Sequence, residues 1–359
     1  MSVVVEEYNP EWPEHFDKIK SELQSFLEDA DIISIEHVGS TSVPGLAAKP
    51  IIDVDIIATR ENIQSAIDAL VAKGNFIYLG ELGIIDRHAL YSPDQKPSRN
   101  IYVCVDGTYQ TRNHLSVRDT LRSDPALREE YGSVKLQLAE RGLDIVDYVE
   151  AKSNILIKIL QKSGVMTEEE LDGVNAANKK GERHGAIMTE RLTLREFVMK
   201  DVTGFHALES IPEVVRYQSF PPRTMEQSKK EVVTIIQNSA VTPREHVELA
   251  VLHEGKFIGR VGAKIKRKNE NGKELEPPHA DLWFSFMPEM HGRGFATEAM
   301  KAFISLLGNP MKLEIECDPR NMGSSKMAER LGFERVSLTE MAYESKEEWV
   351  DSLVYQKDV

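Results

Sequence analysis

Hydrophobic and polar positions in the first part of the chain follow two different periods. Apolar residues recur every three or four positions over residues 9–27 and 61–74, which predicts two amphipathic helices. Short apolar runs with strand character lie at residues 32–38, 51–58, 75–82, 87–92 and 100–105. Residues 114–160 are predicted to be helical, with breaks near Asp124-Pro125 and Gly142. This mixture is typical of a mixed sheet with helices.

The pattern changes between Ser163 and Gly185. Few large apolar residues occur there, and Gly, Asn and Lys are frequent. The first part of the segment is compatible with a short helix, and the rest is typical of a linker. We therefore expect a first domain at residues 1–165, a linker at 166–185 and a second domain at 186–359.

A second alternation of helices and strands follows the linker. Strands are predicted at residues 188–197, 246–252, 257–265, 280–287 and 312–318, with a strand pair at the end of the chain. Helices are predicted at residues 202–210, 225–239, 296–307 and 324–332, and a polar loop at 266–278. The expected fold class is thus a two-domain α/β (α+β) protein.

Composition narrows the function without identifying it. The chain has 359 residues and a formal net charge of −14, which disfavours nucleic acid as a partner because nucleic-acid binders usually carry a basic face. Cys104 and Cys317 lie in apolar, strand-like runs, so we expect buried thiols rather than a disulfide or a metal site. No signal-peptide pattern and no membrane-length apolar stretch is visible. We expect a cytoplasmic protein.

A glycine-rich turn joins the predicted strand at 280–287 to the helix that follows. Gly292 and Gly294 allow a ligand to approach the backbone closely, and Arg293 adds a cation. The first N–H groups of a helix lack internal partners and favour negative charge. The turn can therefore hold a phosphate. On these residues alone a tight turn without a ligand is the simpler interpretation.

Three separated segments together resemble the GNAT superfamily of acetyl-CoA-dependent N-acetyltransferases. They are "TERLTLREF" (189–197), "GRGFATEA" (292–299) and "CDPRNMGSSKMAERLGFE" (317–334), in the family's order and spacing. The resemblance is to the RimJ/RimL-like branch and covers residues 186–357. It implies a mostly antiparallel, splayed sheet flanked by helices, acetyl-CoA as cofactor, and acetyl transfer to a primary amine of a small molecule or a protein N-terminus.

The resemblance also assigns roles to particular residues. Asn321 matches the family asparagine that contacts the pantetheine arm, and Ser324 matches a position that protonates the leaving thiolate. Asp281 falls where relatives place an acidic residue beside the acetyl group, so it is the candidate base. Two alternatives remain open: a solvent-facing strand carboxylate for Asp281, and a helix N-cap for Ser324. The loop that would hold the pyrophosphate comprises His291, Gly292, Arg293, Gly294, Phe295 and Ala296, with His in place of the family's Gln or Arg.

The first domain carries an acidic pair after a Gly-Ser turn. Asp53 and Asp55 alternate on a predicted strand, so both side chains share one face. Two such carboxylates repel each other unless a cation such as Mg²⁺ lies between them. Gly39 and Ser40 can hold a phosphate through backbone N–H and hydroxyl groups. A polar outer face of an edge strand is the alternative interpretation.

The stretch "HVGSTSVPGLAAKPIIDVDI" resembles the nucleotidyltransferase signature and, more narrowly, the GrpB (UPF0157) family over residues 3–162. The resemblance implies a nucleotidyltransferase-like mixed sheet. Asp53 and Asp55 are then candidate metal ligands, and Gly39, Ser40 and Lys49 candidate nucleotide contacts. Active nucleotidyltransferases carry a third carboxylate on a later strand. In this chain that strand is "RNIYVCVDG", where such a carboxylate is not evident.

Further cations could contact phosphate in the first domain, although a solvated surface charge is the alternative for each. These candidates are Lys49, Arg118, Lys135 and Lys152.

Three functions are compatible with these patterns. The leading hypothesis is an N-acetyltransferase fused to a GrpB-like domain that binds a metal or a nucleotide. The second is a metal-dependent nucleotidyltransferase acting on a small molecule through the first domain. The third is a non-catalytic module that binds CoA and a nucleotide. The expected partners are an amine acceptor and a nucleotide, without nucleic acid or membrane.

Overall fold

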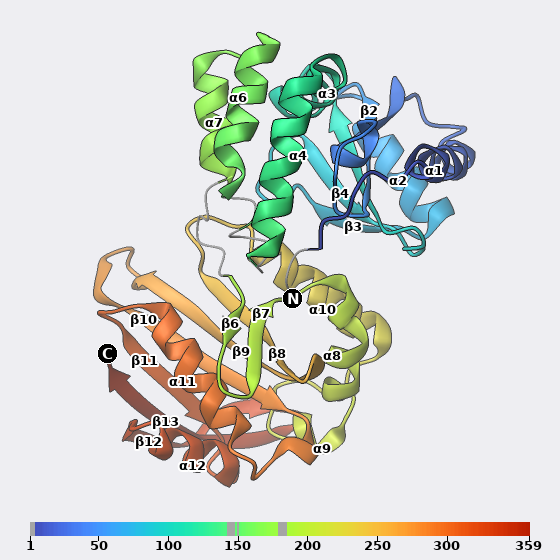
Figure 1. The fold of residues 1–359 in the computed structure, drawn as a ribbon. Coiled ribbons are helices and arrows are strands. Elements are labelled where there is room, and N and C mark those ends of the chain that lie inside the picture. The colour runs from blue at the N-terminus through green and yellow to red at the C-terminus, as the bar shows by residue number, and fades with distance from the viewer. Residues whose placement is uncertain (1–3, 142–147, 149–150, 179–184) are drawn as a thin grey trace. The chain divides into compact units, whose positions relative to one another are not determined.

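The computed structural model describes residues 4–141, 148, 151–178 and 185–359. The chain divides into two compact units, Met1–Gly185 and Ala186–Val359 (Figure 1). Each unit has a sheet with helices on its faces, so both are α/β as predicted. None of the described helices is long and apolar enough to cross a lipid bilayer.

The first unit is built on a five-stranded mixed sheet with the strand order β1-β2-β5-β4-β3. β2 and β5 run parallel, and their register places Asp53 opposite Asn100 and Asp55 opposite Tyr102. The other neighbouring strands are antiparallel. The strands are β1 Ser34–Val38, β2 Ile52–Ala58, β3 Ile77–Gly80, β4 Arg87–Tyr91 and β5 Arg99–Val105.

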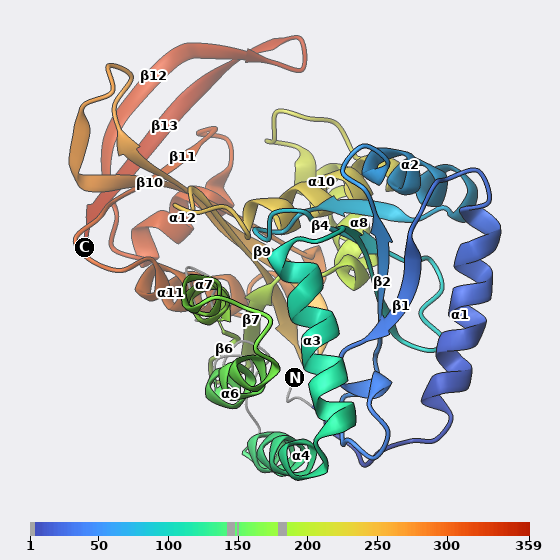
Figure 2. The ribbon, with the colours of Figure 1, turned by 90° about the horizontal axis from the view of Figure 1, so that it is seen from above.

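Helices cover both faces of this sheet (Figure 2). α1 (Trp12–Phe26) and α2 (Ile63–Gly74) bury their apolar stripes against the face that carries Val54 and Ile56. α3 (Tyr109–Ser123) lies on the opposite face, where it meets the acidic side chains of β2. The remaining helices are η1 Ser40–Ser42, α4 Pro125–Glu140, α6 Ser153–Ser163 and α7 Glu168–Asn178.

The second unit is built on an eight-stranded sheet with the order β12-β13-β11-β10-β9-β8-β7-β6. β10 and β11 run parallel, and the other neighbouring pairs are antiparallel. The strands are β6 Ile187–Met188, β7 Leu192–Glu196, β8 His246–His253, β9 Lys256–Lys268, β10 Glu274–Phe286, β11 Lys312–Cys317, β12 Glu334–Ser345 and β13 Glu348–Asp358.

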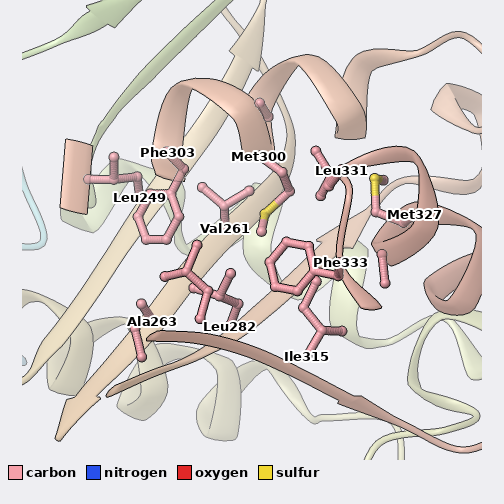
Figure 3. Close-up of a cluster of buried hydrophobic side chains, with 14 of the residues drawn as sticks. Leu249, Val261, Ala263, Leu282, Met300, Phe303, Ile315, Met327, Leu331 and Phe333 are labelled. Carbon is pink, nitrogen blue, oxygen red and sulfur yellow. The ribbon is translucent and has the colours of Figure 1, made fainter. Parts of the chain in front are cut away.

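The main core of the second unit lies between one face of this sheet and two helices (Figure 3). α11 (Phe295–Leu307) contributes Met300 and Phe303, and α12 (Met322–Arg330) contributes Met327. They pack on strand residues such as Val261. The opposite face of the sheet carries charged side chains such as Arg260. The remaining helices are η2 Met199–Asp201, α8 Val202–Glu209, α9 Pro212–Val215, α10 Met225–Asn238 and η3 Pro288–Met290.

The bounds of several elements differ from the predicted ones. β9 and β10 extend into the predicted polar loop at 266–278, because a short turn at Asn269 closes the hairpin with its own side chain. α3 begins at Tyr109, earlier than predicted, with Thr108 as its N-cap. α7 corresponds to the short helix that was compatible with the first part of the predicted linker segment, and its Leu171 is buried in a small apolar cluster of the first unit.

The core of the second unit predicts a large stability effect at Phe303, whose side chain is fully buried. Phe303→Ala should lower the free energy of unfolding by about 3–5 kcal/mol, because it removes apolar contacts and leaves a cavity. Urea denaturation followed by tryptophan fluorescence measures this change. Ser305→Ala on the exposed face of the same helix is the control, with an expected change below about 0.5 kcal/mol. Equal effects of the two substitutions would contradict the assigned core.

Candidate functional site

The parallel pairing of β10 and β11 is short. His279, Ala280 and Asp281 pair with Lys312, Leu313 and Glu314, and the paired register ends there. β10 continues along β9 to Phe286, while β11 continues along β13 to Cys317. β11 is therefore not the strand partner of residues 282–286. Backbone groups on this edge of β10 are open to another hydrogen-bonding partner.

The turn after β10 places backbone N–H groups at the same end of the sheet. Gly292 and Gly294 have φ angles of +72° and +81°, in the left-handed region that favours glycine. Gly294 is the N-cap of α11 and supplies no side chain to cap the helix. The first N–H groups of α11 are consequently left for an external acceptor, and the helix dipole favours a negative one.

A carboxylate on α11 fixes this turn to the start of the second unit. Glu298 accepts hydrogen bonds from the Thr189 hydroxyl and from the backbone N–H and guanidinium of Arg191. Arg191 also donates to the carbonyl oxygen of Arg293, at 3.0 Å. Burial acts to raise the pKa of Glu298, but these hydrogen bonds and the charge of Arg191 lower it. The "TERLTLREF" segment thus positions the turn, a role that the sequence analysis missed.

Two side chains of the turn are directed to the protein itself. His291 donates from Nε2 to the carbonyl oxygen of Phe286, with a separation of 3.0 Å. The Arg293 guanidinium lies over the Phe295 ring, 4.8 Å from its centroid. The histidine thus connects the turn to the end of β10, which leaves the backbone N–H groups to face a ligand.

A cavity of about 850 Å³ lies beside the turn. Its walls include Phe284 and Ser285 from the open edge of β10, and the start of α12. This volume is within the range of cofactor and substrate sites. The residues of the predicted CoA loop and catalytic set that line this cavity are His291, Gly292, Gly294, Phe295, Ala296, Asn321 and Ser324.

The start of α12 decides between the two interpretations of Ser324. Asn321 is the N-cap, and its Oδ1 accepts the N–H of Ser324 at 3.2 Å. The helix begins at Met322, so the predicted start at Ser324 and its N-cap role are wrong. Asn321 takes the cap position because its side-chain oxygen reaches the backbone N–H of the third helical residue. Ser324 lies at that third position and lines the cavity.

Asp281 does not line the cavity. Its carboxylate forms an ion pair with Lys266 of β9, at 2.6 Å, and its side chain is about one-third exposed. It lies within the segment of β10 that is still paired with β11. This position fits the strand carboxylate that the sequence analysis kept as the alternative to a base.

A second, smaller cavity of about 420 Å³ adjoins the first and shares Gln218, Phe284 and Ser285 with it. Its charged lining comes from the sheet face opposite the main core. Arg260 pairs with Glu248 at 2.6 Å and with Glu209 of α8 at 2.5 Å. Burial raises the pKa of Glu248 although Arg260 opposes the effect. Arg223 completes the network with Glu209 and Glu231. The network as a whole has three carboxylates and two guanidinium groups, and the cavity lining itself has two of each.

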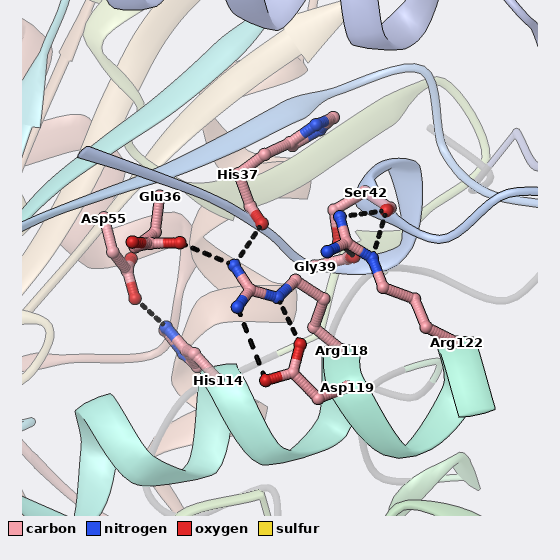
Figure 4. Close-up of polar contacts among 9 residues, drawn as sticks. All are labelled: Glu36, His37, Gly39, Ser42, Asp55, His114, Arg118, Asp119 and Arg122. Carbon is pink, nitrogen blue, oxygen red and sulfur yellow. Dashed lines mark hydrogen bonds and ion pairs between the residues drawn. The ribbon is translucent and has the colours of Figure 1, made fainter. Parts of the chain in front are cut away.

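The acidic pair of the first unit is largely engaged by neighbouring side chains, and Figure 4 shows the contact of Asp55 with His114. Asp55 is fully buried, and its Oδ2 lies 2.7 Å from Nδ1 of His114 on α3. Asp53 accepts a hydrogen bond from the Asn100 amide at 2.7 Å. Gly39, with φ at +69°, lies directly against the Asp53 carboxylate, where any side chain would clash. The predicted Gly-Ser turn and Asp53 therefore meet in space.

The side chains around Asp53 and Asp55 do not fit the ligand set of a two-metal nucleotidyltransferase centre. Among the residues that the structure describes, no group of three or more His, Cys, Asp or Glu side chains is arranged to hold a metal ion. His114 takes one oxygen of Asp55, although the other oxygen is buried without a hydrogen-bond partner in the described chain. Burial raises the pKa of Asp53 despite the hydrogen bond from Asn100. The roles of Asp53 and Asp55 as metal ligands remain a prediction.

A cavity of about 370 Å³ adjoins Asp53 and is lined by Gly39, Ser40 and Lys49. Lys135 and Lys152 also line it, so three of the four predicted phosphate partners converge. Arg118 does not. Its guanidinium lies 2.7 Å from Glu36 and 2.7 Å from Asp119 and also donates to the carbonyl oxygen of His37, which gives it a structural role (Figure 4).

Lys135 is an unusual member of this group because its side chain is buried, with 2% of the residue exposed. Its Nζ has no hydrogen-bond partner in the described chain and lies 4.5 Å from the centroid of the Tyr131 ring. Burial, followed by repulsion from Lys152 and Lys49, lowers its pKa to about 6. Burial and Lys152 lower the pKa of Lys49 to about 8.

Comparison with known proteins assigns both units. The profile of the family described as GrpB protein matches residues 2–162, and that of the acetyltransferase (GNAT) domain matches residues 191–334. A UPF0157 protein of Halalkalibacterium halodurans is 33% identical over 164 residues, which cover 45% of this chain and 83% of that protein. The chain belongs to the GrpB (UPF0157) family. Its second unit is a GNAT acetyltransferase domain.

Two further similarities concern the GNAT unit. An uncharacterized N-acetyltransferase, p20 of Bacillus licheniformis, is 25% identical over 175 residues, which cover 47% of this chain and 93% of that protein. A solved structure of RimL, a ribosomal L7/L12 alpha-N-protein acetyltransferase in complex with coenzyme A, is 16% identical with a TM-score of 0.42. The match covers 48% of this chain and 98% of that one. The predicted fusion of a GrpB domain with a GNAT domain is confirmed.

The low pKa of Lys135 predicts how the stability of the GrpB unit depends on pH. Between the folded pKa of about 6 and the ordinary value of 10.5, the unfolded chain binds more protons than the folded one. Stability should therefore rise with pH in this window, by roughly 1 kcal/mol per pH unit from this group. Urea denaturation at pH 7, 8 and 9 measures the slope, and Lys135→Met should flatten it.

The control for this measurement is Lys158→Met, since Lys158 is exposed on α6 and pairs with Glu130. Its removal should leave the pH slope unchanged. Identical slopes for the wild type and Lys135→Met would show that Lys135 is not a buried, neutral amine.

Proposed function

We propose that the protein is an acetyl-CoA-dependent N-acetyltransferase that acts on a primary amine of a small molecule or a protein N-terminus. The observation that carries the proposal is the convergence of three features on one cavity. They are the open edge of β10, the uncapped start of α11 and the hydroxyl of Ser324. A thioester with a pyrophosphate group needs an anion site, donors for an oxyanion and a donor to the leaving sulfur, and these features could supply them.

The turn would hold the CoA pyrophosphate through backbone N–H groups of residues 292–297. Two adjacent phosphates fit an uncapped helix start because both the N–H groups and the helix dipole favour negative charge. The pantetheine arm, with its two amide groups, would lie along the open edge of β10 in place of a strand. Asn321 uses its side-chain oxygen to cap α12, which leaves its amide N–H groups for the arm.

The chemistry would proceed by direct attack. The amine nitrogen bonds to the thioester carbonyl carbon, and backbone N–H groups of β10 stabilise the oxyanion that forms. The C–S bond would then break, and the Ser324 hydroxyl would donate a proton to the leaving thiolate and regain one from water. The proton of the amine leaves to water, because Asp281 is paired with Lys266 and lies outside the cavity lining.

The acceptor would enter through the adjoining cavity, which meets the first cavity at Phe284 and Ser285. The ion-pair network around it, which includes Glu209, has one carboxylate more than guanidinium groups. This excess favours an amine that carries a second positive charge, because the reacting nitrogen itself must be neutral. A lower KM for diamines than for monoamines of equal length would support this acceptor class. Equal KM values would count against it.

Gly294 gives the sharpest test of cofactor binding. Gly294→Asp should weaken CoA binding more than 100-fold, because the side chain adds bulk and negative charge where the pyrophosphate is proposed to bind. Isothermal titration calorimetry with CoA measures this. Gly308→Asp is the matched control, since Gly308 has φ at +82° at the other end of α11 and open space around it. Unchanged CoA affinity in Gly294→Asp would refute the proposed site.

Ser324 tests the chemical step separately from binding. Ser324→Ala should lower kcat about 100-fold while the dissociation constant of CoA changes less than threefold, because only the leaving thiolate loses its donor. Thiol release from acetyl-CoA with a panel of primary amines measures kcat. Ser324→Thr keeps a hydroxyl and should retain most of the activity. An unchanged kcat in Ser324→Ala would exclude Ser324 as the acid.

A further inference from the structure

The cavity of the GrpB unit collects cationic side chains from separate parts of the fold. Lys49 precedes β2, Lys135 lies in α4, Lys152 precedes α6, and Arg87 belongs to β4. Asp53 is the one carboxylate among the residues described as lining this cavity. Since these cations come from four segments, their proximity is a product of the tertiary fold and not of a basic stretch of sequence.

The three lysines are held by aromatic rings instead of carboxylates. Lys49 and Lys152 lie 5.6 and 5.7 Å from the centroid of the Tyr148 ring. In the part of the chain that the structure describes, none of the three forms an ion pair with a carboxylate. The rings shape and order the ammonium groups without neutralising them.

The energies of these contacts do not balance the cost of burial. A cation–π contact contributes about 0.5–2 kcal/mol. Removing an ammonium group from water costs several kcal/mol, and charged lysines this close also repel one another, so the Lys135 amine, with its pKa lowered to about 6, is largely neutral at pH 7 without a ligand. Lys135 carries the largest cost because its Nζ is buried without a hydrogen-bond partner in the described chain. A ligand with negative charge would supply the missing interactions.

We propose that this cavity binds the phosphate group of a small phosphorylated molecule through Lys49, Lys135 and Lys152, without a metal ion. The volume of about 370 Å³ accommodates a phosphate with a compact organic part. Ser40, Asn100 and Asn113 line the same cavity and offer hydrogen bonds to polar groups of that part. This site differs from one in which phosphates reach Asp53 through Mg²⁺.

Binding to the full chain tests the proposal, with inorganic pyrophosphate, AMP and adenosine as probes and EDTA present throughout. The start of α11 also attracts phosphates, so the measurements use the Gly294→Asp background, in which that site is blocked. Pyrophosphate and AMP should bind and adenosine should not. This pattern would assign recognition to the phosphate, whereas comparable binding of adenosine would overturn the assignment.

Lys135→Met is the decisive variant, because Met fills a similar volume without the charge. Affinity for pyrophosphate should fall at least tenfold, and Lys152→Met should act in the same direction. Lys158→Met is the matched control and should change affinity less than twofold. Thermal unfolding verifies that Lys135→Met is folded, which the removal of a buried, unpaired amine favours.

Two outcomes would overturn the proposal. One is equal pyrophosphate affinity in Gly294→Asp with and without Lys135→Met. The other, in a parallel titration with Mg²⁺ in place of EDTA, is binding that requires Mg²⁺ and is lost in Asp53→Asn, which would assign the phosphate to the acidic pair. The result is independent of acetyl transfer, because loss of CoA binding at Gly294 leaves the GrpB cavity unchanged.

Discussion

The GNAT unit depends on the end of the β10–β11 pairing at Asp281 and Glu314. β9 and β13 hold the two strands from their outer sides, and the core beneath them, with Leu282 and Ile315, keeps the strands in place. The strands therefore separate without losing support. Backbone polar groups need partners, so the separated edge is open to a ligand or to water. The starts of α11 and α12 both reach this opening, which is why one short interruption organises the whole site.

Recognition by backbone, as proposed for the turn, would accommodate one departure from the family pattern. His291 stands where relatives have Gln or Arg, yet its imidazole bonds to Phe286 within the protein. The ligand would meet N–H groups whose position depends on Gly292, Gly294 and the hydrogen bonds of Glu298. Side chains in the turn can vary as long as the backbone path is fixed. Glu298, which also lines the cavity, and Arg191 are consequently as important to its shape as the turn itself.

The sequence predicted features that arise from local chemistry. The glycine turn, the alternation of Asp53 and Asp55 and the amphipathic helices all depend on neighbours within a few residues. Two contacts that bear on the open alternatives were not predicted. Asn321, three residues before Ser324, takes the cap that was one interpretation of Ser324. Lys266 on a neighbouring strand forms an ion pair with Asp281. No pattern along the chain shows which strand edge stays open, because pairing is decided by the whole sheet.

The candidate cavity of each unit contains polar groups without a partner, but the groups differ between the two units. In the GNAT unit the groups are backbone N–H donors, which carry no net charge and attract a negative ligand through hydrogen bonds and the helix dipole. In the GrpB unit the group is the amine of Lys135, whose charged form is so costly to bury that its pKa falls to about 6. Asp55, by contrast, is already paired with His114. The greater unmet electrostatic demand thus lies with the lysines, and it favours an anion over a metal as the ligand of this unit.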